Sequence, residues 1–143
     1  MTLTGRHIEL IGIGGCGMSG LARVLQARGA QVSGSAQVPS PTTEALEQDG
    51  ITVSTDQSVA SLKPATDLVI ATAALPAAHP VLAKASSRGR EVIRYADALG
   101  RLQEEGFGIS IAGTHGKSTT CAMCCHALLH AGLAPSFICL LYP

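Results

Sequence analysis

The sequence has no tryptophan, and its aromatic residues amount to only 3% of 143 residues. Charged residues are also scarce at 14%, against roughly 25% in an average soluble protein, while hydrophobic residues make up 46%. Disordered chains combine few hydrophobic residues with many charges, so this composition excludes a disordered protein. The length suits one domain of ordinary size, or slightly more, with a buried core.

An excess of positive charge is missing as well, because ten Lys and Arg balance ten Asp and Glu. No basic cluster compensates locally, so we expect neither nucleic acid nor a membrane surface as a partner. No apolar run approaches the roughly 18 residues of a membrane span, and the first residues lack the cationic and then apolar order of a signal peptide. The sequence therefore predicts a cytoplasmic protein.

A disulfide framework is not expected, because the five cysteines are an odd number and three of them crowd together at 121, 124 and 125. We interpret them as reduced thiols. The three clustered cysteines, together with His126 and His130, suggest a metal site, since residues four apart share a helix face. No second Cys pair supports that site, and the alternative is a buried apolar helix face formed by the three cysteines and Leu128.

Short apolar runs alternate with helical patterns along the chain. Strands are predicted over 7–13, 31–33, 51–54, 67–71, 91–93 and 107–112, and helices over 18–28, 43–49, 80–88, 96–105 and 121–131. Such alternation is typical of an α/β fold, in which helices cover both faces of a parallel sheet. The acidic pair and glycine at 104–106 predict a boundary between a domain over 1–105 and the start of a second domain over 106–143, a piece too short to fold unaided.

The sequence GIGGCG at 12–17 fits G-x-G-x-x-G between a predicted strand and a predicted helix. In that context the glycines let backbone amides approach a diphosphate at the positive end of a helix, although they can also serve only as a tight turn. NAD and NADP are disfavoured, because no acid or arginine lies at the end of the next strand, where the chain reads VSGSA. Cys16 is either a reactive thiol, activated by the helix start, or a small side chain that fills the turn.

A second glycine-containing loop, GTHGKST at 113–119, follows the predicted strand over 107–112 and leads into a helix. Gly-Lys-Ser at a helix entry is typical of a P-loop, whose backbone amides cradle phosphates while the lysine meets the β and γ oxygens and the serine hydroxyl binds Mg²⁺. The general pattern has a further glycine where Ile111 stands, so a variant is required. His115 inside the loop is either a nucleotide contact or a solvated histidine.

The two loops together resemble a known family, the Mur ligases. GTHGKST resembles their ATP loop, and GIGGCGMSG at 12–20 is similar to the opening loop of the members that add alanine. Further matches are VSGS at 32–35, TAALP at 72–76 with Pro80, VIR at 92–94 and AGLAPSFI at 131–138. The resemblance covers nearly the whole chain, and the members that recycle a tripeptide share the ATP loop but differ in the first loop.

The resemblance implies a Rossmann-like domain that binds UDP-N-acetylmuramate, followed by the start of a P-loop domain that binds ATP and Mg²⁺. In such ligases of peptidoglycan precursor synthesis, ATP phosphorylates the lactyl carboxylate and L-alanine attacks the acyl phosphate. The implied substrate-binding residues are Gly12, Gly14, Gly15, Cys16, Gly17, Ser35, Thr72 and Ala73. The implied ATP-binding residues are Gly113, Thr114, His115, Gly116, Lys117, Ser118 and Thr119, with Lys117 as the catalytic residue and Ser118 as the metal ligand.

Three features depart from the family. Ala36 stands where an aspartate is usual, and His79 replaces an asparagine before Pro80. No carboxylate follows Glu105, and the family continues for several hundred residues beyond 138. We therefore expect this chain alone not to catalyse ligation, and its apolar residues after 106 to favour self-association. The alternatives are an NAD-type Rossmann oxidoreductase domain and a non-catalytic nucleotide-binding remnant.

Overall fold

A computed structural model describes residues 3–56, 58, 62–76 and 78–138. Its centre is a parallel sheet of five strands in the order β3-β2-β1-β4-β5. The strands are β1 (His7–Ile11), β2 (Gln31–Ser35), β3 (Thr52–Ser54), β4 (Leu68–Ala71) and β5 (Glu91–Arg94). The chain first builds outward from β1 on one side and then crosses over to build β4 and β5 on the other, as Rossmann-like sheets do.

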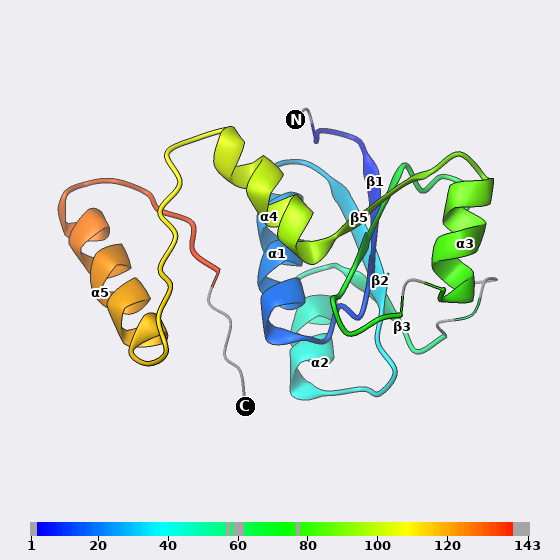
Figure 1. Ribbon diagram of the computed structural model, residues 1–143, viewed down its shortest axis with the longest axis horizontal. Coiled ribbons are helices and arrows are strands. Elements are labelled where there is room, and N and C mark those ends of the chain that lie inside the picture. The colour runs from blue at the N-terminus through cyan, green and yellow to red at the C-terminus, as the bar shows by residue number, and fades with distance from the viewer. Residues whose placement is uncertain (1–2, 57, 59–61, 77, 139–143) are drawn as a thin grey trace.

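Helices cover both faces of this sheet, as the alternating sequence pattern predicts. The helices are α1 (Cys16–Ala27), α2 (Pro41–Gln48), α3 (Pro80–Ser87), α4 (Tyr95–Glu104) and α5 (Lys117–His130). Figure 1 shows α1, α2 and α4 on one face and α3 alone on the other. The expected α/β class with a Rossmann-like parallel sheet is therefore confirmed.

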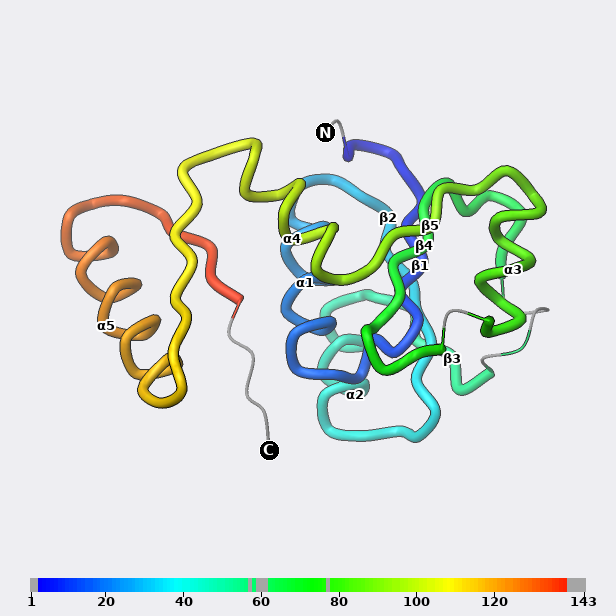
Figure 2. The backbone as a smooth tube through the Cα atoms, viewed as in Figure 1, coloured from blue at the N-terminus to red at the C-terminus, as the bar shows by residue number. Residues whose placement is uncertain are grey.

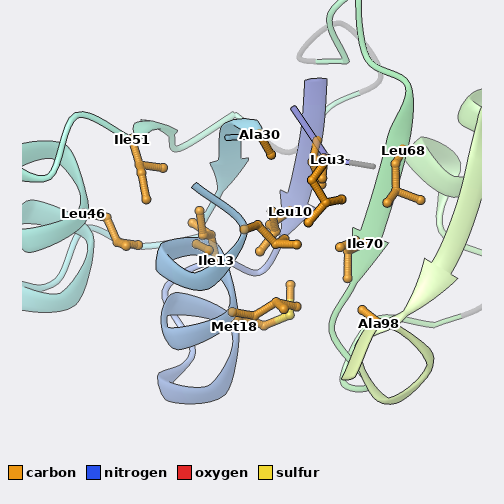
Figure 3. Close-up of a cluster of buried hydrophobic side chains, with 14 of the residues drawn as sticks. Leu3, Leu10, Ile13, Met18, Ala30, Leu46, Ile51, Leu68, Ile70 and Ala98 are labelled. Atoms are coloured by element: carbon orange, nitrogen blue, oxygen red, sulfur yellow. The ribbon is translucent and has the colours of Figure 1, made fainter. Parts of the chain in front are cut away.

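The hydrophobic core is split by the sheet into two clusters, because successive side chains of a strand point to opposite faces. Ile8 and Leu10 of β1 pack with Leu21 and Met18 of α1 in the larger cluster, part of which Figure 3 shows. Ile11 points the other way and packs in the smaller cluster, which includes side chains from α3. β4 contributes to both clusters and is buried along its whole length, as expected of a strand covered on both faces.

Most of the predicted elements are confirmed within a few residues, but the predicted strand over 107–112 is wrong. These residues form no strand, and they connect α4 to α5 as an extended segment. An isolated strand cannot satisfy its N–H and C=O groups, and within the described residues no strand of the sheet pairs with this segment. The helix predicted over 121–131 begins one turn earlier than expected, at Lys117.

The last helix, α5, is the least integrated element of the molecule. None of its residues is buried, and Figure 2 shows it separated from the sheet by α1 and α4. The segment 134–138 runs back towards the body of the protein, where Ile138 packs against the larger core cluster. In the part of the chain described by the structure, no helix has the length and apolar character needed to cross a membrane.

Candidate functional site

The first candidate site lies at the carboxyl edge of the sheet, around β1. The chain continues to β2 on one side of β1, while β4 lies on the other, and open α/β sheets bind ligands outside such a reversal of strand order. The segments 12–17, 35–36 and 72–73 follow or end the three central strands. The structure thus brings the predicted substrate-binding residues to one edge of the sheet.

The loop after β1 is held in shape by backbone contacts. Gly12 has a φ of 86°, in the left-handed region that favours glycine. The N–H groups of Gly12 and Ile13 both donate to the carbonyl oxygen of Ser35, at 2.8 and 3.0 Å, and the Gly15 N–H donates to the Gly12 carbonyl at 3.2 Å. The loop is therefore fixed against the end of β2.

This loop ends at the start of α1, which is open to a ligand. Gly15 is the N-cap and offers no side chain to the helix, and the first turn contains no acidic residue. Gly15 and Cys16 are exposed, whereas Gly17 is buried. A helix of twelve residues with an uncapped N-terminus presents N–H donors and a positive dipole end, which together favour a phosphate group.

Gly14 faces a neighbour that the sequence does not reveal, the start of α2. A Cβ atom on Gly14 would lie 3.3 Å from Thr43 Cγ2 and 3.4 Å from Ala36 Cβ. Ser40 caps α2 by accepting a hydrogen bond from the Thr43 N–H, and the Thr43 hydroxyl accepts one from the Ser40 N–H. Gly14 therefore lies in a narrow gap in which a larger side chain would have to displace its neighbours.

The residues predicted at the ends of β2 and β4 have different surroundings. Ser35 is 0% exposed, and its hydroxyl has no hydrogen-bond partner among the residues that the structure describes, while its carbonyl holds the glycine loop. Thr72 is half-buried against Gly12, and Ala73 is exposed. The structure thus places Ser35 under the loop and Thr72 and Ala73 beside it.

Two residues with unassigned roles lie at the same edge. His79 is the N-cap of α3, and its Nδ1 accepts from the Val81 N–H at 3.4 Å, which is a capping role an asparagine also performs. Arg94 ends β5 and donates from Nη1 to the carbonyl oxygens of Thr72 and Leu75, at 3.2 and 2.9 Å. The sequence pattern includes Arg94 but gives no sign of these contacts.

Tyr95, the first residue of α4, has a buried hydroxyl without a partner in the described structure. Burial raises the pKa of the Tyr95 phenol, and the charge of a Cys16 thiolate adds to the rise. Tyr95 is therefore within electrostatic reach of the loop that begins α1. Its side chain also lines a cavity of about 530 Å³ together with Lys117 and Gly113 of the second loop.

The second loop turns the chain into α5 at a glycine. Gly116 has a φ of 77° and is the N-cap of α5, a helix of fourteen residues with no acidic residue in its first turn. Residues 113–116 are exposed. Lys117 Nζ donates to the carbonyl oxygen of Gly113 at 2.7 Å, so the ammonium group lies over the loop.

The cysteines of α5 show no metal-binding arrangement. Within the described residues, no group of three or more His, Cys, Asp or Glu side chains is close enough to hold a metal ion. Cys121, Cys124 and Cys125 are half-buried and line a cavity of about 440 Å³ beside Leu99 and Leu102 of α4. The expected apolar helix face is thus partly covered rather than buried in a core.

Comparison with known proteins identifies the family. Residues 7–106 match the sequence model of a protein family described as "Mur ligase family, catalytic domain". The chain belongs to the Mur ligase family. The matched region contains the whole five-stranded sheet and the first glycine loop.

The relatives are much longer than this Mur ligase chain. The UDP-N-acetylmuramate--L-alanine ligase of Kineococcus radiotolerans is 42% identical over 133 residues, which cover 92% of this chain and 28% of that protein. The UDP-N-acetylmuramate-alanine ligase structure from Thermotoga maritima has a TM-score of 0.80 at 30% identity, over 88% of this chain and 30% of that one.

A ligase named for a tripeptide substrate is at least as similar in structure. The UDP-N-acetylmuramate:L-alanyl-gamma-D-glutamyl-meso-diaminopimelate ligase from Neisseria meningitides has a TM-score of 0.86 at 32% identity. The match covers 98% of this chain and 44% of that one. Structural similarity therefore supports the family and does not distinguish between these two kinds of ligase.

Proposed function

We propose that this chain is the N-terminal part of a cytoplasmic ligase that joins L-alanine to UDP-N-acetylmuramate in peptidoglycan precursor synthesis. The observation that carries the proposal is the uncapped start of α1, which follows the glycine loop at the carboxyl edge of β1. The 42% identity to an alanine-adding relative supports this substrate pair over the tripeptide.

In this proposal residues 1–105 bind the sugar nucleotide, and residues 106–143 begin the ATP-binding domain. The N–H groups of Gly14, Cys16 and Gly17 receive the diphosphate, while the Gly15 N–H stays bonded to the Gly12 carbonyl. Ser35 holds the loop through its own carbonyl. Thr72 and Ala73 follow β4 at the same edge of the sheet. NAD binding is disfavoured, because β2 is followed by buried Ala36, where a ribose-binding acid would be needed.

The second loop fits the triphosphate of ATP, because a glycine with positive φ turns the chain into α5 and Lys117 follows directly. Its residues 113–119 would surround the phosphates, with Lys117 stabilising the transferred charge and Ser118 providing a hydroxyl ligand for Mg²⁺. ATP supplies the phosphoryl group that converts the lactyl carboxylate into an acyl phosphate. His115 lies exposed in the loop, where it is accessible to a nucleotide.

We expect no ligation by this chain alone. Besides the hydroxyl, a P-loop domain supplies a carboxylate for Mg²⁺, and residues 106–143 contain no Asp or Glu. The segment before the P-loop forms no strand, so the loop lacks the sheet that fixes it in a P-loop domain. Binding of the sugar nucleotide by residues 1–105 does not need these features.

Calorimetry with UDP-N-acetylmuramate tests the proposal. The native chain should bind, and Gly14→Val should lose binding, because the side chain would fill the gap between Ala36 and Thr43. Gly15→Val should also lose binding but fold normally, since a Cβ there meets only the Gly12 carbonyl at 3.6 Å. Gly100→Ala, in open space on α4, is the control that should bind like the native chain. Equal affinity in all four proteins would contradict the proposal.

A titration with ATP and Mg²⁺ tests the division into domains. We expect weak binding or none. Micromolar affinity, roughly −8 kcal/mol, that disappears without Mg²⁺ would mean that residues 106–143 already form a complete nucleotide site.

A further inference from the structure

Arg94 ends the edge strand β5, and its side chain reaches towards the centre of the sheet. In the sheet register, Arg94 pairs with Ala71 of β4, and Ala71 pairs with Ile11 of β1. The backbone of Arg94 is therefore two strands away from the glycine loop, about 10 Å at the usual strand spacing. Its guanidinium reaches the segment that follows β4, the neighbouring strand.

The guanidinium of Arg94 contacts backbone carbonyls rather than an acid. Nη1 donates to the carbonyl oxygens of both Thr72 and Leu75, which begin and close the turn after β4. The Arg94 N–H donates to the Asp97 carboxylate at 3.2 Å, and this bond fixes the start of α4. Arg94 therefore connects the turn after β4 to the start of α4. In the described structure no carboxylate contacts its guanidinium.

The turn that Arg94 holds is the one that touches the glycine loop. Thr72 Cγ2 lies 2.7 Å from the place that a Cβ on Gly12 would occupy, and the Thr72 N–H donates to the Ile11 carbonyl at 3.1 Å. A shift of Thr72 would therefore be transmitted to Gly12. In the described part of the chain, Thr72 is thus the single residue that connects the Arg94 guanidinium to the glycine loop.

Arg94 also carries charge that this edge otherwise lacks. The described segments that directly follow the other four strands, 12–15, 36–40, 55–56 and 72–76, contain no Lys or Arg. A nucleoside diphosphate is an anion, and a half-buried guanidinium near the loop interacts with it more strongly than an exposed one would.

We infer that Arg94 is a positioning residue for the diphosphate, which it serves by holding the 72–75 turn against Gly12 and by adding positive charge beside the loop. The inference rests on the proposed sugar-nucleotide function and names the part of the ligand on which it acts. It predicts that the effect of Arg94 falls on the phosphates and not on the nucleoside.

Titrations of UDP and uridine, followed by NMR, separate these two parts. Arg94→Met should weaken UDP binding by about tenfold or more, as expected for the loss of a charged hydrogen-bonding group, and change uridine binding less than about twofold. Arg94→Lys should recover most of the UDP affinity, because an ammonium group can donate to the same two carbonyls. Arg101→Met, which removes an exposed partner of Glu91 on α4, is the matched control and should leave both affinities unchanged.

Thr72→Ala tests the same contact with Arg94 in place, should Arg94→Met fail to fold. It removes the methyl group beside Gly12 and should lower the ratio of UDP to uridine affinity in the same direction. An equal loss for UDP and uridine in either variant, or no loss in both, overturns the inference. If the native chain binds UDP-N-acetylmuramate but Arg94→Met keeps the native ratio of UDP to uridine affinity, the positioning role of Arg94 is wrong and the proposed function stands. If the native chain binds no uridine nucleotide, the proposed function fails with the inference.

Discussion

Thr72 closes the space above Gly12, since its Cγ2 atom lies 2.7 Å from where a Cβ atom of residue 12 would be. Real Cβ atoms do not approach other atoms so closely. Gly12 also has a φ of 86°, so two independent restrictions act on the same residue. The glycine that ends β1 is thus required by the fold, before any ligand is considered.

Gly12→Ala should therefore destabilise the protein strongly. Left-handed backbone costs a residue with a Cβ about 1–2 kcal/mol, and forced contact in a packed region adds about 1–3 kcal/mol. The expected loss is about 2–5 kcal/mol in the free energy of unfolding, measured by urea denaturation. Gly89→Ala provides the comparison, since Gly89 has a φ of 68° with no atom within 4 Å and should lose only about 1–2 kcal/mol. Equal losses would mean that the Thr72 contact relaxes at no cost.

Glu9 should make stability depend on pH. Its side chain is 3% exposed in the middle of β1 and accepts a hydrogen bond from the Ser33 hydroxyl. Burial raises the pKa of Glu9 from 4.5, and the Ser33 bond and the Lys63 charge only partly oppose this. The folded protein therefore holds the Glu9 proton more tightly than the unfolded chain does. The stability gained from protonated Glu9 is fully present below pH 4.5 and is lost as the pH rises through the raised pKa.

Glu9→Gln should remove that loss, because a neutral amide keeps the shape of the protonated acid. At pH 7 the variant should be at least as stable as the native protein, and its free energy of unfolding should fall less between pH 4 and 7. Glu47→Gln, on the exposed side of α2, is the control and should keep the native slope. A Glu9→Gln variant with the native pH slope would show that Glu9 does not contribute to it.

The buried hydroxyl of Tyr95 leads to a prediction about thermal stability. An unpartnered buried polar group costs about 1–3 kcal/mol, so removing it does not weaken the fold. Tyr95→Phe should keep or raise the thermal unfolding midpoint, whereas Tyr95→Ala, which also removes the ring that packs on the core, should lower it. A lower midpoint for Tyr95→Phe would require a partner for the hydroxyl.

The first loop could be predicted from the sequence because its signal is local. GIGGCG sits between an apolar run and an amphipathic helix, and the structure places Gly12 at the turn and Cys16 at the helix start, as the spacing requires. The closeness of Thr43 to Gly14 and the hydrogen bond from Arg94 to Thr72 bring together residues that are far apart in the sequence. They depend on strand order, which a single sequence does not specify.

The strand predicted over 107–112 shows where a local sequence pattern misleads. Its alternating residues, such as Ile109 and Ile111, satisfy the local pattern of a strand. A strand forms only when neighbouring strands accept its hydrogen bonds, and α4 separates this segment from β5 along the chain. Local pattern therefore predicted the tendency of the segment, while the surrounding structure determined its conformation.

The apolar surface after residue 106 gives the last prediction. Phe107 is 97% exposed, and further exposed hydrophobic side chains are Ile109, Met123, Leu129, Leu133 and Phe137. α5 has fourteen residues and none is buried, so its helical state gains little from packing. We expect the segment either to associate with a second copy of the chain or to unfold locally while the sheet remains intact.

Hydrogen exchange combined with light scattering distinguishes these outcomes. Amides of α5 should exchange much faster than those of β1 in a monomer, or the measured mass should exceed that of one chain. Replacing Phe107 and Phe137 by serine should reduce association without changing the protection of β1, because neither residue belongs to the two core clusters. A monodisperse monomer in which α5 is as protected as β1 would place residues 106–143 in the same cooperative unit as the sheet, and the expected domain boundary near Gly106 would be wrong.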